Sequence, residues 1–308
     1  MKEHESVEPR TEAALNFSLG LLESSESARL QEHLRNGCAA CEAEVVSFAE
    51  VAGAVGMSAT AVAPPPRLRG LLLRAVKEHS ASRGEAEVQG WRILHTAALP
   101  WLPTRRDGIW EKSLLHDSAR HRSARLIKIN PGAKIPAHRH HGIEESIVLE
   151  GTGELGDFVF GPGDYHRASS GSLHPSYGSK EGCVFLLFSG TEYEFCSDSE
   201  EQSSPEHFVT VRTTSGAWQS DRPGLNIQTL FSGTRSLVGA TSIHQLSAGA
   251  VLATSEFSVS EAYVLEGGAR LGSAELSAGD YLQKVQVSSK SELESEHGCT
   301  LLIRSFSP

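Results

Sequence analysis

Two groups of histidine, cysteine and glutamate residues stand at spacings that could hold a metal ion. In the first group His138 and His140 are two residues apart, Glu144 follows four residues later, and His174 comes thirty residues after that. On a β-strand, side chains at i and i+2 point to the same face, so the two imidazoles can reach one ion. Three imidazoles and a carboxylate suit zinc, iron, manganese or nickel. This segment therefore predicts a transition-metal site built on β-strands.

The third imidazole of this group has two candidates. His166 follows Gly163 by three residues, and His174 follows it by eleven. His141 breaks the i, i+2 alternation, so we expect its ring to point outward. The simpler alternative is that the adjacent histidines form a polar turn that binds no metal.

The second group, near the N-terminus, has the composition of a zinc site. His33 is followed by Cys38 and, three residues later, by Cys41. Two thiolates and an imidazole at this separation can reach one tetrahedral Zn²⁺. A helix–helix turn with small buried cysteines is the alternative interpretation. The upstream candidates for a fourth ligand are His4, Glu8 and Glu12.

Helical periodicity covers the N-terminal part of the chain. Apolar residues recur at three- and four-residue intervals over residues 7–57, and Ser24-Ser25-Glu26 has the composition of a helix start. The Pro- and Ala-rich stretch 58–66 cannot continue a helix. It leads into a basic amphipathic helix over 67–78, which we expect to bind a groove on a partner protein. The predicted partner-binding residues are Leu68, Leu71, Leu72, Arg74 and Ala75.

From residue 91 onward the chain changes character. Short β-rich segments, separated by glycine and proline, predict an all-β sandwich or barrel. The clearest of these segments are 126–129, 145–149 and 183–188.

This β-rich part contains an internal repeat. Gly163-Asp164-Tyr165 recurs 116 residues later as Gly279-Asp280-Tyr281, and a shift of 117 places Glu144 on Glu261. Several such matches in the same order predict two related β domains. At the histidine positions the second copy carries Ser255, Phe257 and Lys290. We therefore expect the second copy to keep only the carboxylate and to bind no transition metal.

Composition narrows the class of protein. The 308 residues are 39% hydrophobic and 21% charged, which is typical of globular domains. A net charge of −10 disfavours direct nucleic-acid binding and favours a protein partner with a basic surface. Five scattered cysteines do not form a disulfide framework. With no signal peptide and no apolar run long enough for a bilayer, we expect a cytoplasmic protein without membrane association.

The first metal group has the spacing of a known β-barrel family. Gly132, His138, His140, Glu144 and Gly151 together resemble the first cupin motif. The segment Gly161–Asp164 followed by a histidine is similar to the second cupin motif. The resemblance implies a jelly-roll barrel that holds its metal on these side chains.

The N-terminal part resembles a different family. The segments 11–22, 30–34 and 37–45 are similar to the N-terminal domain of zinc-associated anti-sigma factors, although the gap between His33 and Cys38 is one residue longer than usual. That resemblance implies a domain that wraps an extracytoplasmic-function (ECF) sigma factor and hides its polymerase-binding surface.

The two parts in one chain resemble the ChrR group of anti-sigma factors. This resemblance favours His174 over His166 as the remaining cupin ligand. It implies a cytoplasmic regulator that sequesters an RpoE-like ECF sigma factor and releases it in response to singlet oxygen or related oxidants. It also implies zinc at either site, with iron, manganese or nickel as alternatives in the cupin.

The predicted fold class is therefore an α + β multidomain protein. We expect a helical anti-sigma domain over 1–80, a metal-binding cupin over 90–200 and a second, degenerate cupin over 205–308, with a homodimer through the cupins as one arrangement. No catalytic residue is assigned.

The competing hypothesis is a cupin dioxygenase or isomerase that carries iron or manganese at the same ligands. Its nearest acid–base candidates would be Tyr165 and Glu145. A third hypothesis is a zinc-stabilised storage or scaffold protein, which would have no specific partner.

Overall fold

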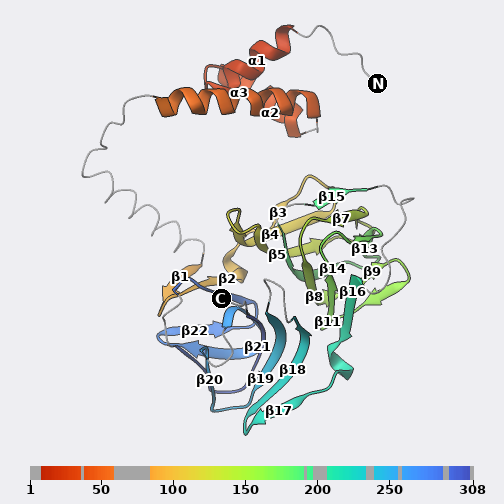
Figure 1. Ribbon diagram of the computed structural model, residues 1–308, viewed down its shortest axis with the longest axis vertical. Coiled ribbons are helices and arrows are strands. Elements are labelled where there is room, and N and C mark those ends of the chain that lie inside the picture. Colours follow the sequence, from red (N-terminus) through yellow and green to blue (C-terminus); the bar gives the residue numbers. More distant parts are fainter. Residues whose placement is uncertain are drawn as a thin grey trace, which may run out of the picture. The chain divides into compact units, whose positions relative to one another are not determined.

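The computed structural model describes residues 8–35, 38–58, 84–190, 193–196, 207–233, 239–255, 259–286 and 291–305. The chain divides into two compact units, residues 1–72 and 73–308, which are considered separately (Figure 1). The predicted partner-binding helix, with Leu68, Leu71, Leu72, Arg74 and Ala75, lies outside the described residues.

The first unit is helical, as predicted. Its helices are α1 (Glu8–Ser18), α2 (Ser24–Arg35) and α3 (Ala39–Ser58). Helix α1 ends before Gly20, whose φ of +69° lies in the left-handed region that glycine tolerates. Helix α2 begins at Ser24, where the sequence predicted a start. Ser18 at the end of α1 donates a hydrogen bond to the carbonyl of Val45 in α3 (3.1 Å), which joins these two helices.

The second unit consists almost entirely of β-strands, and the predicted strands at 126–129, 145–149 and 183–188 are confirmed within β5, β8 and β14. Its first half contains β1 (Glu85–Val88), β2 (Trp91–His95), β3 (Leu102–Pro103), β4 (Ile109–Asp117), β5 (Arg122–Ile129), β6 (Lys134–Ile135), β7 (His138–His140), β8 (Glu144–Gly151), β9 (Gly153–Leu155), β10 (Phe158–Phe160), β11 (Asp164–Ala168), β12 (Leu173–His174), β13 (Tyr177–Gly178), β14 (Cys183–Ser189) and β15 (Tyr193–Phe195). Its second half contains β16 (Phe208–Arg212), β17 (Gln219–Arg222), β18 (Leu225–Ser232), β19 (Ala240–Leu246), β20 (Ala250–Ala253), β21 (Val259–Leu271), β22 (Ala274–Ser277), β23 (Asp280–Lys284), β24 (Glu292–Ser295) and β25 (Cys299–Ser305).

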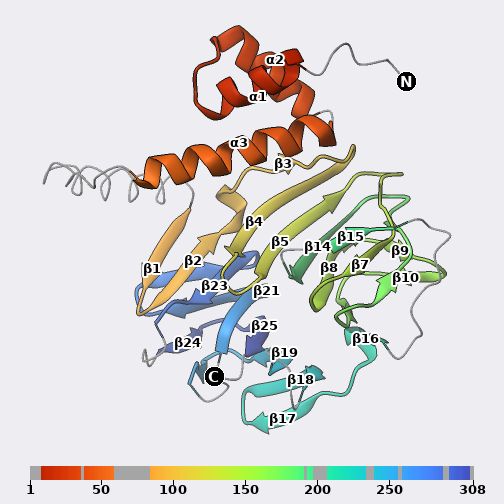
Figure 2. The same cartoon turned by 45° about the horizontal axis from the view of Figure 1, so that its top comes forward.

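The two halves repeat one strand order. The main sheet of the first half runs β16-β11-β8-β14-β5-β4-β3, and that of the second half runs β1-β2-β23-β21-β25-β19-β18-β17, which is the same order with β1 added at the edge (Figure 2). Both halves have a register shift at the same place. In the first half it lies at Leu149, between Val148 and Glu150 of β8, and in the second half at Leu265, between Val264 and Glu266 of β21. The internal repeat predicted from sequence is thus present in the strand pairing.

Each half also contributes strands from its start to the sheet of the other half. Strand β2 of the first half pairs with β23 of the second, and β16 of the second half pairs with β11 of the first. Because the exchanged strands complete both sheets, neither half has its full sheet without the other.

A common core lies between the halves. One cluster of buried side chains draws Ile147 and Leu186 from the first half and Ile243 and Leu302 from the second. Two further clusters, one inside each half, contain Ile127 and Leu301 respectively. The strands β8 and β21 therefore have two buried faces, one toward the interior of their own half and one toward the other half. Among the described residues, no helix has the length and hydrophobicity needed to span a bilayer.

Candidate metal centres

The structure brings His138, His140 and Glu144 together. Both histidines lie on β7, and Glu144 is the first residue of β8. His140 Nε2 lies 3.4 Å from one carboxylate oxygen of Glu144, and His138 Nε2 lies 4.0 Å from the other. The imidazoles are almost fully buried, with exposed fractions of 5% and 3%. The i, i+2 spacing has therefore placed both rings on one interior face, as predicted.

The hydrogen bonds of these rings favour metal binding at Nε2. His138 Nδ1 lies 2.9 Å from the carbonyl oxygen of Pro136, and His140 Nδ1 lies 3.1 Å from that of Ser172. A carbonyl only accepts, so each Nδ1 must carry the proton, and in the neutral ring Nε2 then presents a lone pair toward Glu144. Lone pairs that face a carboxylate repel it unless a proton or a metal cation lies between them, and the Glu144 side chain is only 14% exposed. The donor set thus fits a divalent metal.

The backbone of His174 is correctly placed for a further ligand. Strand β12 pairs antiparallel with β7 so that His174 stands directly opposite His138. Residues directly opposite in such a pair are close cross-strand neighbours. The side chain of His174 lies outside the described part of the structure, so its role as a ligand stays a prediction.

The histidines His166 and His141, which are close in sequence to this site, lie outside the His138/His140/Glu144 group. His166 places Nδ1 3.2 Å from Thr210 Oγ1, and its ring stacks on Phe208 with centroids 5.6 Å apart. Among the described side chains, it does not join the metal-binding group. His141 is exposed, as predicted.

Two aromatic residues beside the site were not predicted. Strand β15 pairs with β7 and sets Tyr193 opposite His140 and Phe195 opposite His138. The ring centroid of His138 lies 5.5 Å from that of Tyr193 and 6.0 Å from that of Phe195. The alternation of aromatic residues in Tyr193-Glu194-Phe195 was the available signal, because such a pattern places both rings on one face.

The acid–base candidates of the enzyme hypothesis point away from this site. Glu145 follows Glu144 on β8 and therefore lies on the opposite face of the sheet. There Tyr165 donates a hydrogen bond to Glu145 (2.5 Å), and Arg304 binds the same carboxylate (2.6 Å). Burial alone would raise the pKa of Glu145, but Arg304, Tyr165 and Thr241 hold that pKa below its usual value. Tyr165 and Glu145 belong to the contact between the halves and are not available as acid–base groups at the candidate metal site.

The alignment of Glu144 with Glu261 was wrong by one residue. Glu145 stands opposite Phe188, and Glu261 stands opposite Arg304, which is 116 residues after Phe188. Glu261 is therefore the counterpart of Glu145, and Ser260 occupies the position of Glu144. A shift of one residue moves a side chain to the other face of a strand, which is why the sequence match misled. The second half lacks the carboxylate as well; Phe257 and Lys290 lie outside the described residues.

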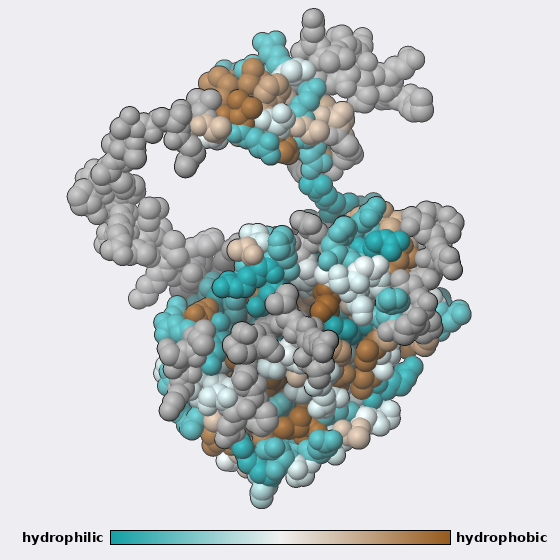
Figure 3. Space-filling view, in the orientation of Figure 1, coloured by the Kyte–Doolittle hydropathy of each residue, from teal (hydrophilic) through white to brown (hydrophobic). Residues whose placement is uncertain are grey.

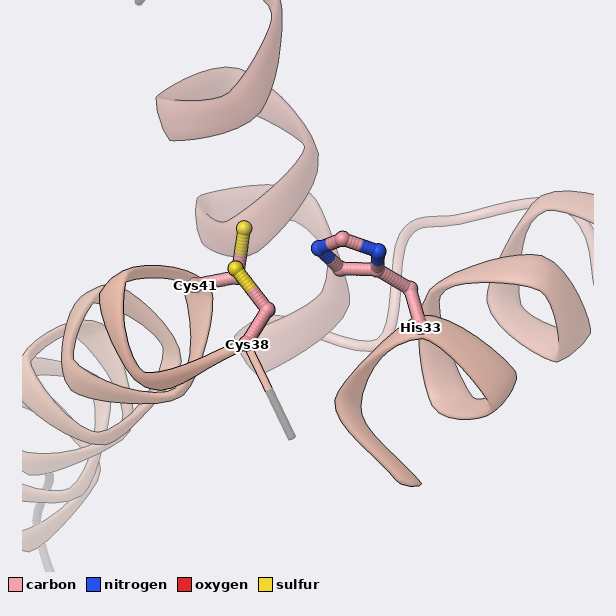
Figure 4. Close-up of side chains that lie close together, drawn as sticks. All are labelled: His33, Cys38 and Cys41. Carbon is pink, nitrogen blue, oxygen red and sulfur yellow. The ribbon is translucent and has the colours of Figure 1, made fainter. Parts of the chain in front are cut away.

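The N-terminal group also converges. His33 lies on α2, Cys41 on the first turn of α3, and Cys38 just before that helix (Figure 4). Their ligand atoms all lie within 4.8 Å of one another. The two thiols and the ring face one another, which suits three of the four positions of a tetrahedral zinc site. Of the upstream candidates, Glu12 is exposed and not in the group, while His4 and the side chain of Glu8 lie outside the described residues.

Comparison with known proteins identifies one part of the chain. Residues 89–192 match the family model of the ChrR Cupin-like domain. These residues form a cupin domain. No match was found among curated proteins.

Solved structures of similar fold cover most of the chain. The chain is similar to a proposed dioxygenase from Nostoc punctiforme (TM-score 0.59, 14% identity, covering 72% of this chain and 88% of that one). It is also similar to salicylate 1,2-dioxygenase from Pseudaminobacter salicylatoxidans (TM-score 0.51, 14% identity, covering 80% and 95%) and to oxalate decarboxylase from Lactobacillus farciminis (TM-score 0.50, 12% identity, covering 70% and 86%). At these identities the similarity concerns the fold alone.

Proposed function

We propose that this protein is an anti-sigma factor of the ChrR type, which sequesters an RpoE-like ECF sigma factor and releases it on an oxidative signal such as singlet oxygen. The observation that carries the proposal is the presence, in one chain, of the His33/Cys38/Cys41 group on a helical unit and a ChrR-like cupin with its own His/His/Glu group. The proposed site of action is the cytoplasm.

The helical unit is the proposed sigma-binding part. It exposes several large apolar side chains, and hydrophobic surface is visible on it in Figure 3. A small unit with this much exposed apolar surface is suited to a protein partner. We assign the same role to the segment with Leu68, Leu71, Leu72, Arg74 and Ala75, which lies outside the described residues. The exposed apolar residues of α1, α3 and the loop after α1 are Leu15, Leu19, Leu21, Val46 and Val51.

The cupin is the proposed sensor. His138, His140, Glu144 and His174 would hold zinc, or else iron, manganese or nickel, and His33, Cys38 and Cys41 would hold zinc. We propose domains over 1–80, 90–200 and 205–308, the last being a degenerate cupin without metal ligands. A homodimer through the cupins is part of this proposal.

The test is capture of the sigma factor by the full-length chain. The protein would be co-expressed with the tagged ECF sigma factor encoded nearest its gene, and the captured ratio measured before and after exposure to singlet oxygen. We expect stoichiometric capture that falls on exposure. A His33→Ala/Cys38→Ala/Cys41→Ala variant should lose capture, whereas Cys196→Ser should keep it. Failure of the unmodified chain to bind any ECF sigma factor would reject the proposal.

A second candidate function is that of a metal-dependent cupin enzyme. The converged His138/His140/Glu144 group favours it, and two of the similar structures are a salicylate 1,2-dioxygenase and an oxalate decarboxylase. Oxygen uptake by iron-loaded protein with salicylate, and CO₂ release by manganese-loaded protein with oxalate, would test this function. Turnover that His138→Ala abolishes would favour the enzyme.

A further inference from the structure

The second half has an open cavity, and side chains fill the equivalent space in the first half. The cavity has a volume of about 440 Å³ and lies against four adjacent strands, β17, β18, β19 and β25. Ile303, which lines it, also belongs to the buried core of the second half, so the cavity opens on the interior face of that half. Its volume falls within the range of small-molecule sites. The lining includes Ser220, Ile227, Thr229, Ser242, His244 and Ser305.

The repeat explains why this space is open. Ser242 stands opposite Thr229 and Ile303 in its sheet, and Arg125 has the equivalent place 117 residues earlier, opposite Ser113 and Leu187. In the first half the long side chain of Arg125 contacts Glu111 (3.6 Å) and Ser189 (3.1 Å). In the second half the counterparts of Arg125 and Glu111 are the smaller Ser242 and Ile227. Replacing an arginine–glutamate pair by serine and isoleucine removes both the volume and the charges.

The remaining lining is rich in uncharged hydrogen-bonding groups. Besides its serine and threonine hydroxyls it contains the buried ring of His244, whose Nε2 lies 2.9 Å from Ser242 Oγ. Burial lowers the pKa of His244 to about 4, so the ring is neutral near pH 7 and can either donate or accept. Among the described lining residues the only charged group is Asp221, which is 40% exposed and lies 3.7 Å from Arg222. An anionic ligand would find no cation among the described lining residues, and an apolar ligand would displace water from exposed hydroxyls such as that of Thr229 without replacing its hydrogen bonds.

We infer that the second half is a binding site for a small, uncharged, polyhydroxylated molecule, of the size and chemistry of a monosaccharide or cyclic polyol. Hydroxyl groups of such a ligand both donate and accept, which matches a lining of serine and threonine hydroxyls and a neutral imidazole. The site uses no metal, and it is independent of the proposed sigma binding because none of its residues belongs to either metal-binding group.

The test is direct binding to the full-length chain. Isothermal titration calorimetry and ligand-detected NMR at pH 7.5 would use D-glucose, myo-inositol and glycerol as probes. Citrate and inorganic phosphate would serve as anionic control ligands. We expect at least one polyol to bind. Ser242→Arg, which introduces the residue of the first half, should weaken binding at least tenfold. The matched control Thr214→Arg places the same residue at an exposed position outside the lining and should bind as the unmodified protein does.

A smaller change guards against misfolding of the arginine variant. Ser242→Ala removes one hydroxyl without adding volume and should weaken binding by about fivefold, the usual effect of one hydrogen bond. Thermal melting and far-UV circular dichroism would verify that each variant is folded. The inference is overturned if no polyol binds at a concentration of ~10 mM, which would detect a dissociation constant of ~1 mM. It is also overturned if the anions bind and the polyols do not, or if both folded Ser242 variants bind polyol as tightly as the unmodified protein does.

Discussion

The guanidinium group of Arg304 lies over the ring of Phe188, with its Cζ 4.1 Å from the ring centroid. These residues hold equivalent positions in the two halves, each opposite a buried glutamate. From this position Arg304 bonds to Glu145 of the first half (2.6 Å) and to Glu261 of the second (2.7 Å). Arg122 of the first half also reaches Glu261 (2.5 Å). One arginine thus bridges both copies of the repeat, beside the shared apolar core.

Removing this arginine should strongly destabilise the β unit. Arg304→Met would leave two carboxylates buried without their main cation, and breaking a buried pair in this way costs about 3–5 kcal/mol. Urea unfolding followed by circular dichroism would measure the change. Arg270→Met is the control, because Arg270 pairs with Glu294 at an exposed position and should cost less than about 1 kcal/mol. A loss for Arg304→Met as small as that expected for the control would show that the bridge between the halves adds nothing.

Metal binding by the cupin should depend on buried, not exposed, histidines. His138→Ala removes an imidazole from the converged group, so the metal content of purified protein should fall by about one equivalent. His141→Ala, at the exposed neighbouring position, should keep the full content. Mass-spectrometric metal analysis of both proteins provides the measurement. Full metal content in the His138 variant would mean that the group is not a metal site.

The identity of the remaining cupin ligand can be decided with a matched pair of variants. We expect His174→Ala to lower the metal affinity by at least about tenfold, since losing even a partner that orients a ligand typically costs 10–100-fold. His166→Ala should bind metal normally, because its ring is engaged with Thr210 and Phe208. Competition with a chromogenic chelator measures both affinities. The reverse order would assign the ligand to His166.

The close approach of Gly151 to a neighbouring strand should not tolerate a side chain. Gly151 has φ of +70°, and a Cβ there would collide with the carbonyl oxygen of Gly182. We expect Gly151→Ala to cost about 3 kcal/mol or more, since both backbone strain and overpacking oppose it. Gly132→Ala is the control: φ is similar, at +81°, but nothing lies within 4 Å, so the cost should be about 1 kcal/mol. Thermal unfolding of both variants measures the difference, and the melting temperature of Gly151→Ala should be the lower of the two.

Protonation of His244 should make the protein less stable in mild acid. Burial lowers its pKa from 6.5 to about 4, so between these values the unfolded chain binds more protons than the folded one. The free energy of unfolding should therefore fall as pH drops from about 6.5 toward 4, by roughly 3 kcal/mol for this group. Urea unfolding at several pH values, compared with His244→Gln, isolates the contribution. A difference between the two proteins that does not vary with pH would contradict it.

The sequence predicted most of the local structure because local rules apply there. Strand alternation correctly placed His138 and His140 on one face and His141 outside, and helical spacing brought His33 to the two cysteines. The β-rich repeat was also visible, since matching glycines mark matching turns. These features depend on residues close together in the chain, where periodicity and turn chemistry act directly.

Only the tertiary structure decided the pairings across the repeat. The exchange of β2 and β16 cannot be derived from a strand's own residues, because partner choice depends on contacts far apart in sequence. A one-residue difference in register made Glu261 the counterpart of Glu145, a partner of Arg304, and not the counterpart of Glu144 that the sequence match predicted. Likewise, the open cavity at Ser242 and Ile227 is recognised only when the structure shows that their counterparts are the larger residues Arg125 and Glu111. The sequence alone determines which residue types lie close together along a strand or helix, whereas the pairing of distant strands and the cavities between them depend on tertiary packing.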